Sequence, residues 1–231
     1  MDLYLIRHPP VAIQAGTCYG STDVGLLDTP HAGAKVIAAK LGCLGSLGGT
    51  GGTSGVGNTG DASLVHSYSS SLTTARVWTS PLRRCRTVAE ALVVEALHGP
   101  SDSDASTTTP LVDPRLSELD FGKWEGVAWD AVPRAELDAW AADIVHARPH
   151  GGESVAMLAE RTAGWLAALD NEAADSLHMA ITHAGTIRVM TAQALQLPLL
   201  NCLNWSIDLR GICHLTRPNA QAPWAMAAWN L

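Results

Sequence analysis

Two histidines in the sequence each follow an apolar segment and stand beside residues that suit anions. Arg7 and His8 end the first apolar segment, and His183 ends another. Arg84 closely follows a third apolar segment, residues 76–79. A guanidinium can bind two phosphate oxygens at once, and an imidazole can attack phosphorus or donate a hydrogen bond. If the three segments are neighbouring parallel strands, these side chains meet in one crevice suited to phosphate chemistry.

The elements that would position these residues alternate between short apolar segments and longer helical ones. We expect strands over Asp2–Arg7, Arg76–Thr79 and His178–Thr182, with closing strands from Trp205 onward. Apolar residues at helical spacing predict helices over His31–Leu44, Pro81–Leu97, Trp129–His146, Glu153–Asn171 and Gly185–Leu195. This alternation predicts an α/β protein, a three-layer α/β/α sandwich with a mainly parallel central sheet. Ligands of such sheets bind beyond the carboxyl ends of the strands.

Composition excludes several classes of partner. The chain has 231 residues with a formal net charge of −7, which argues against binding to nucleic acid or to an anionic membrane. Hydrophobic residues make up 47% of the chain, enough for one sizeable core, and no apolar run is long enough to span a bilayer. The N-terminus lacks the pattern of a secretory signal. The five cysteines include no CxxC pair, which predicts neither a disulfide framework nor a zinc site and favours the cytoplasm.

Two polar stretches interrupt an otherwise single domain spanning residues 1–231. Between residues 42 and 60, 9 of 19 residues are glycine, and we interpret about 43–74 as a flexible insertion. Residues 99–109 form a second, Ser/Thr-rich loop. Residues 55–60 match the dinucleotide fingerprint GxGxxG, but no strand precedes them and no amphipathic helix follows, so we set that interpretation aside.

Four blocks in order along the chain resemble the histidine phosphatase superfamily, also called the phosphoglycerate mutase-like family. The blocks are LIRH at 5–8, SPLRRCRTVAE at 80–90, LSELDFGKWEG at 116–126, and THAG at 182–185 followed by Arg188. The resemblance implies the phosphoglycerate mutase-like version of the predicted sandwich. It also implies a phosphatase that needs no cofactor or metal, because arginine and histidine supply the positive charge.

The resemblance implies a role for each matching residue. His8 is the nucleophile that becomes a phosphohistidine, and Arg7 and Arg84 bind the phosphoryl oxygens. His183 donates to the same oxygens in the transition state. Glu118 protonates the departing oxygen and then activates water, since an alkoxide leaves poorly without a proton.

Other residues in these blocks leave alternatives open. Glu125, seven residues after Glu118, could serve as the acid instead. We expect Arg83 and Arg86 to be solvated or ion-paired. Surface or core positions are expected for the other histidines: His31, His66, His98, His146, His150, His178 and His214. Three tryptophans at helical spacing are expected in the core: Trp129, Trp140 and Trp165.

The chain departs from the family after His8. The usual continuation is Gly followed by Glu or Gln, whereas this sequence has Pro9 and Pro10. Proline has no backbone N–H, so a phosphate contact made by that amide in relatives is lost here. The fixed φ of proline could instead stiffen the loop that presents His8.

Within the superfamily the likeness is greatest to the α-ribazole phosphatase branch of cobalamin synthesis. It rests on CYGSTDV at 18–24, GGES at 151–154 and SPLRRC at 80–85. We therefore expect a small phosphomonoester substrate, with α-ribazole 5′-phosphate as the candidate. Alternatives are a broad-specificity phosphatase, a mutase, and an inactive module that binds a phosphate ligand.

The same blocks predict contacts to the substrate beyond its phosphate. By resemblance, Tyr19, Gly20 and Thr22 bind substrate. Glu153 follows two glycines at a helix start, where it could meet a ribose hydroxyl or an arginine in the pocket. The sequence does not indicate an oligomeric state.

Overall fold

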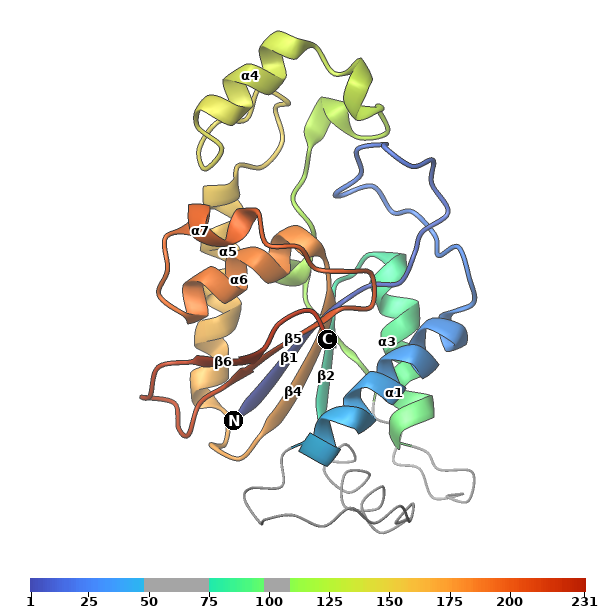
Figure 1. Ribbon diagram of the computed structural model, residues 1–231, viewed down its shortest axis with the longest axis vertical. Coiled ribbons are helices and arrows are strands. Elements are labelled where there is room, and N and C mark those ends of the chain that lie inside the picture. The colour runs from blue at the N-terminus through green and yellow to red at the C-terminus, as the bar shows by residue number, and fades with distance from the viewer. Residues whose placement is uncertain (48–74, 98–108) are drawn as a thin grey trace, which may run out of the picture.

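The computed structural model describes residues 1–47, 75–97 and 109–231 (Figure 1). Most of the expected insertion, including the GxGxxG match, and nearly all of the second polar loop lie outside these residues. The first helix continues to Leu47, so residues 43–47 of the expected insertion are helical.

A six-stranded, mainly parallel sheet forms the centre of the protein, which confirms the predicted fold class. Its order is β3-β2-β4-β1-β5-β6. The strands are β1 (Asp2–Arg7), β2 (Arg76–Thr79), β3 (Leu111–Val112), β4 (Leu177–Thr182), β5 (Ile212–Thr216) and β6 (Ala225–Ala228). The first four strands are parallel: β1 pairs with β4, and β2 pairs with both β4 and β3. At the other edge, β5 pairs antiparallel with β1, and β6 pairs antiparallel with β5.

Helices cover both faces of the sheet because side chains of the central strands alternate between two cores. Leu3 and Leu5 of β1 lie in one core, and Tyr4 and Ile6 lie in the other. In Figure 1, α1 and α3 lie on one side of the sheet, with α5, α6 and α7 on the other. The helices are α1 (Pro30–Leu47), α3 (Arg83–Leu97), α4 (Arg134–Ala142), α5 (Val155–Ala168), α6 (Ala184–Ala194) and α7 (Leu199–Leu203).

A hydrogen bond to Ser80 and the proline at position 133 explain two differences from the expected helices. The helix expected from Pro81 begins at Arg83, because the Ser80 hydroxyl accepts from Leu82 N at 3.3 Å and holds a turn before it. The helix expected over 129–146 is divided into a short 3-10 turn at Trp129–Ala131 and α4. Pro133 separates them, since it lacks an N–H and disfavours helical backbone at the preceding residue.

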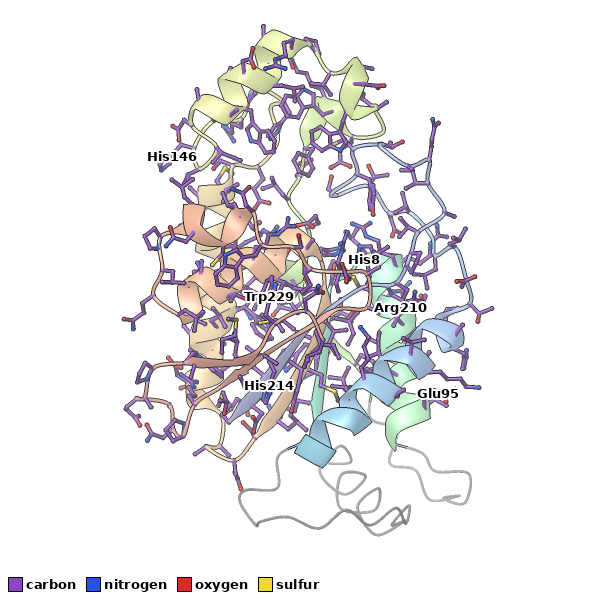
Figure 2. The ribbon with its side chains drawn as sticks, in the orientation of Figure 1. His8, Glu95, His146, Arg210, His214 and Trp229 are labelled. Atoms are coloured by element: carbon purple, nitrogen blue, oxygen red, sulfur yellow. The ribbon has the colours of Figure 1, made fainter. Side chains whose placement is uncertain are left out.

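Residues 119–153, which we call the cap segment, extend beyond the carboxyl ends of β1, β2 and β4 and include α4 (Figure 1). Its core is a separate aromatic cluster around the buried Trp124. In Figure 2, His8 lies at the end of the sheet that faces this segment. Within the described ranges, no helix is long and apolar enough to cross a membrane.

Candidate active site

The ends of three parallel strands bring the two histidines together. β1 and β4 are neighbours in register, Arg7 opposite Thr182, and His8 N donates to Thr182 O at 3.0 Å. The His8 and His183 rings lie 5.3 Å apart, centroid to centroid, in an edge-on arrangement. Ser80, at the end of β2, donates its N–H to Ile181 O at 3.1 Å. The parallel pairing expected from the sequence therefore holds.

A cavity of about 290 Å³ opens at these strand ends, and we call it the strand-end cavity. Its walls combine predicted and unforeseen residues: Arg7, His8, Thr17, Tyr19, Arg84, Glu118, Trp129, Ala184 and Arg188. Four other predicted site residues, Gly20, Thr22, Glu153 and His183, do not line it. Gly20, Thr22 and His183 instead contact Arg84, which lines the cavity. Glu153 pairs with Arg161, which holds the backbone of Glu118.

His8 is buried and held in one orientation by the proline that follows it. Its Nδ1 lies 2.7 Å from Pro9 O. Because a carbonyl can only accept, Nδ1 carries the proton and Nε2 keeps its lone pair. Burial, together with the nearby charge of Arg84, lowers the pKa of His8 to about 3. Pro9 thus lacks the amide of the usual glycine but supplies the carbonyl that fixes the tautomer of the His8 ring.

Arg84 is fully buried and held by the loop at residues 20–22. Its Nη2 donates to Gly20 O at 2.6 Å and its Nη1 to Thr22 O at 2.7 Å. The guanidinium also lies 5.3 Å from the ring centre of Tyr19. Gly20 and Thr22 therefore position Arg84 through their backbone carbonyls.

Arg7 approaches the same cavity from the end of β1. Its Nη1 donates to Ile207 O at 2.6 Å. Its Nε is buried and has no hydrogen-bond partner among the described residues. A buried guanidinium N–H without a partner is costly, so this N–H can donate to an anionic oxygen at no loss of protein contacts.

His183 lies beneath the cavity and links Arg84 to Ser80. Arg84 Nε donates to His183 Nδ1 at 3.3 Å, and His183 Nε2 lies 2.9 Å from Ser80 Oγ. The proton is therefore on Nε2 in this arrangement. Burial first, and then the charge of Arg84, lowers the pKa of His183 well below its usual value.

Glu118 is fixed at the first turn of α6. Its Oε2 accepts from Gly185 N at 3.0 Å, and its Oε1 accepts from Leu119 N at 3.1 Å and Thr186 N at 3.2 Å. A Cβ on Gly185 would lie only 2.5 Å from Glu118 Oε1, so the close approach of this carboxylate depends on a glycine at that position. These contacts hold the Glu118 carboxylate in the wall of the strand-end cavity.

Glu125, the alternative acid, has a different position. Its carboxylate accepts from the amides of Gly20, Ser21, Thr22 and Phe121 at 2.9 to 3.1 Å. Burial opposes its ionisation, but these hydrogen bonds and one from the Thr22 hydroxyl outweigh it and lower the pKa of Glu125. Glu125 does not line the strand-end cavity; it holds the loop that in turn holds Arg84.

Glu153 meets an arginine, but outside the strand-end cavity. Its carboxylate pairs with Arg161 at 2.7 Å. Arg161 also donates to Arg115 O at 2.7 Å and to Glu118 O at 3.1 Å. Glu153 therefore supports the backbone that carries Glu118.

Sequence reasoning gave no site role to four wall residues of the strand-end cavity, one of which is Ala184 at the start of α6. Trp129, expected in a core, is half-buried on the cavity wall and stacks on Trp140 at 6.2 Å within the cap segment. Thr17 and Arg188 complete the wall. Arg188 follows the second histidine by five residues, a spacing already visible in the sequence, and its Nε donates to Trp205 O at 2.6 Å.

The remaining charged and polar clusters lie apart from this cavity. In the described part of the chain, no group of three or more His, Cys, Asp or Glu side chains could hold a metal ion. A larger hollow of about 590 Å³ lies over α5 and α6, around Arg217 and Trp224, and contains none of the predicted site residues. His178 is buried between Trp78 and Ser176.

Comparisons with known proteins identify the family. No curated protein sequence matches the chain. Solved structures do: an α-ribazole phosphatase from Shigella flexneri is 19% identical with a TM-score of 0.73, covering 100% of this chain and 96% of that one. A mycobacterial glucosyl-3-phosphoglycerate phosphatase is 23% identical with a TM-score of 0.72, covering 99% and 98%. Residues 59–231 match the histidine phosphatase superfamily (branch 1), and the chain accordingly belongs to that superfamily and is a phosphatase.

Proposed function

We propose that the protein hydrolyses small phosphomonoesters through a phosphohistidine formed on His8. The observation that carries this proposal is the fixed, neutral imidazole of His8, which keeps a lone pair on Nε2 and lines a cavity together with the three arginines Arg7, Arg84 and Arg188. A nucleophile with an available lone pair, next to fixed positive charge, is what transfer of a phosphoryl group requires.

In the first step, Nε2 of His8 attacks phosphorus and the bond from phosphorus to the ester oxygen breaks. Glu118 gives its proton to the departing alkoxide, which leaves as an alcohol. Arg7 and Arg84 bind the phosphoryl oxygens as charge builds on them. His183 orients Arg84 through Nδ1, and we expect its Nε2–H to exchange its hydrogen bond to Ser80 Oγ for one to a phosphoryl oxygen.

In the second step, the carboxylate of Glu118 takes a proton from water as the water oxygen attacks phosphorus. The bond between phosphorus and Nε2 breaks, which releases inorganic phosphate and restores the neutral imidazole. Glu118 regains the proton that it gave in the first step, so the enzyme is ready for another cycle.

Arg7 and Arg84 supply the positive charge, and we expect turnover without a metal. The test is hydrolysis of p-nitrophenyl phosphate by purified protein with and without EDTA. Equal rates are expected; loss of activity with EDTA and its return with a divalent cation would overturn the metal-independent mechanism.

The substrate that we favour is α-ribazole 5′-phosphate. The three sequence blocks at 18–24, 80–85 and 151–154 support this choice, with a broad-specificity phosphatase as the alternative. A panel of α-ribazole 5′-phosphate, glucosyl-3-phosphoglycerate, nucleotides and sugar phosphates distinguishes them. A kcat/KM for α-ribazole 5′-phosphate well above all others supports the first, and a flat profile supports the alternative.

A further inference from the structure

A second cavity, of about 190 Å³, lies between the cap segment and the helices α5, α6 and α7. We call it the cap cavity. Its lining is mostly aliphatic and aromatic: Glu118, Leu119, Phe121, Trp140, Ile144, Val155, Leu158, Ala184, Gly185, Arg188, Val189, Leu203 and Asn204. Nothing in the proposed chemistry at His8 uses these apolar walls.

The cap cavity adjoins the strand-end cavity. Glu118, Ala184 and Arg188 line both. The carboxylate of Glu118, held by the amides of α6, therefore stands at the boundary between a charged space and an apolar one.

The geometry of phosphoryl transfer points the departing alcohol toward this boundary. The attacking and leaving atoms lie roughly in line through phosphorus, so the ester oxygen faces away from His8. That oxygen must also lie within hydrogen-bond reach of Glu118 if this residue protonates it. The rest of the alcohol then extends past Glu118, where the cap cavity begins.

The walls of the cap cavity determine what it can hold. Phe121 and Trp140 meet edge to face at 6.1 Å, and Leu158, Val189 and Leu203 are aliphatic. Glu118 and Arg188 are the only charged side chains among the described residues of its walls, and both belong to the shared boundary. A hydroxyl or carboxylate buried among such walls would lose hydrogen bonds to water without replacing them. A dry cavity of about 150 Å³ can hold benzene, so this one has room for an aromatic ring.

We propose that the cap cavity binds an aromatic ring carried by the departing alcohol, so that the preferred substrates are phosphomonoesters of aryl-bearing alcohols. This inference rests on the proposed function, because it uses the direction in which the alcohol leaves. It adds a specificity site built by Phe121, Trp140, Ile144 and Leu203, none of which contributes to the transfer of the phosphoryl group.

The first test compares 2-phenylethyl phosphate with ethyl phosphate. Both leave as primary alkoxides, so the chemical step makes similar demands on Glu118, and the two esters differ mainly in the ring. We expect kcat/KM to be at least about tenfold higher for the phenyl ester, because a filled apolar pocket discriminates at this level for even small groups.

A pair of variants on α7 locates the preference. Leu203→Asp places a charge in the cap cavity, whereas Leu200→Asp places the same charge on an exposed position of the same helix, 58% exposed. We expect Leu203→Asp to bring the phenyl-to-ethyl ratio close to one and Leu200→Asp to leave it unchanged. The ratio is measured on a single preparation, so a smaller folded fraction cancels.

Binding of non-hydrolysable analogues keeps the two proposals separate. The dissociation constants of 3-phenylpropylphosphonate and propylphosphonate, measured by calorimetry, do not depend on turnover. Tighter binding of the phenyl compound that is lost in Leu203→Asp supports the cap cavity proposal, whether or not the esters are hydrolysed. If neither ester is hydrolysed, only the proposed function is overturned. Equal binding and equal kcat/KM for each pair would overturn the cap cavity proposal while leaving the chemistry at His8 intact.

Discussion

The strand-end cavity and the cap cavity share three wall residues but differ in how their side chains are held. In the strand-end cavity, His8 is fixed by Pro9 O, Arg84 by two backbone carbonyls and Glu118 by backbone amides. In the cap cavity, most of the walls are apolar side chains held by packing, such as the edge-to-face contact of Phe121 with Trp140.

This difference separates reaction from specificity. Hydrogen bonds to backbone atoms fix direction as well as distance, and chemistry at phosphorus needs both. Apolar packing tolerates changes of shape as long as volume is kept. A fold that builds the two cavities in these two ways can keep its reaction while the alcohol that it accepts changes. The predictions below begin at the strand-end cavity, continue to the boundary between the two cavities, and end on the sheet.

Replacing the nucleophile should produce the largest effect and leave the cap cavity intact. We expect His8→Ala to lower kcat for p-nitrophenyl phosphate by about 10⁴-fold or more, because the covalent route is lost. The exposed His146→Ala variant is the control and should retain full activity. A His8→Ala enzyme with near-normal kcat would remove His8 from the mechanism.

The boundary residue Glu118 should show an effect that depends on the leaving group. We expect Glu118→Gln to lower kcat for ethyl phosphate by about 10²- to 10⁴-fold, because an alkoxide needs the proton. Nitrophenolate leaves without one, so p-nitrophenyl phosphate should lose much less. Glu160→Gln, an exposed position on α5, serves as the control. Equal losses for the two esters would assign the acid to another residue.

Glu125 should affect mainly the strand-end cavity, and more weakly. Its carboxylate accepts from the amides of the loop that holds Arg84, and the NH₂ group of a glutamine would face those donors. We expect Glu125→Gln to raise both KM and the inhibition constant of inorganic phosphate by about tenfold, since a hydrogen-bonded charge is worth about 1.5–3 kcal/mol. Glu90→Gln, at an exposed ion pair on α3, is the control.

The cap cavity gives the contrasting readout for that variant. The phenyl-to-ethyl ratio should change much less than the phosphate inhibition constant in Glu125→Gln, because only one of the amides that Glu125 holds, Phe121 N, belongs to the cap cavity. A changed ratio with an unchanged phosphate inhibition constant would mean that Glu125 acts on the cap segment instead of on Arg84.

The smallest effect concerns stability at low pH, and it arises on the sheet side of the molecule. Burial lowers the pKa of His178 from 6.5 to about 4. The unfolded chain therefore binds a proton in this range that the folded chain does not, and the free energy of unfolding falls as pH drops from 6.5 toward 4. Each such histidine contributes a slope of about 1.4 kcal/mol per pH unit.

Urea denaturation at several pH values between 7 and 4 measures that slope. His178→Gln should make it shallower whatever its effect on stability at pH 7, whereas His146→Gln, with an exposed histidine, should not. An unchanged slope in His178→Gln would contradict the lowered pKa.

Much of the sheet could be predicted because its strands are bounded by strong local signals. Asp2–Arg7 ends at two prolines, and Arg76–Thr79 stands between polar stretches. β3 was missed because two exposed residues at a sheet edge make no pattern. The break at Pro133 was missed because the apolar spacing continues across it, although the proline itself favours a break.

The site was less predictable where tertiary contacts decide. The order of strands lets sequence reasoning join His8 to His183, since parallel neighbours end at one edge. Helical spacing marks Trp129 and Trp140 as apolar but does not say which layer they meet. They lie in the cap segment, half-buried on the walls of the two cavities. Whether Glu153 contacts a substrate or Arg161 likewise depends on how α5 packs.

Trapping the covalent intermediate tests the central claim most directly. The enzyme is mixed with substrate, quenched in alkali, in which phosphohistidine persists, and digested for mass spectrometry. We expect one phosphoryl group on the peptide that contains His8, and none in His8→Ala or in protein unfolded before mixing. A phosphoryl group on any other residue, or continued turnover by His8→Ala, would contradict a phosphohistidine at His8.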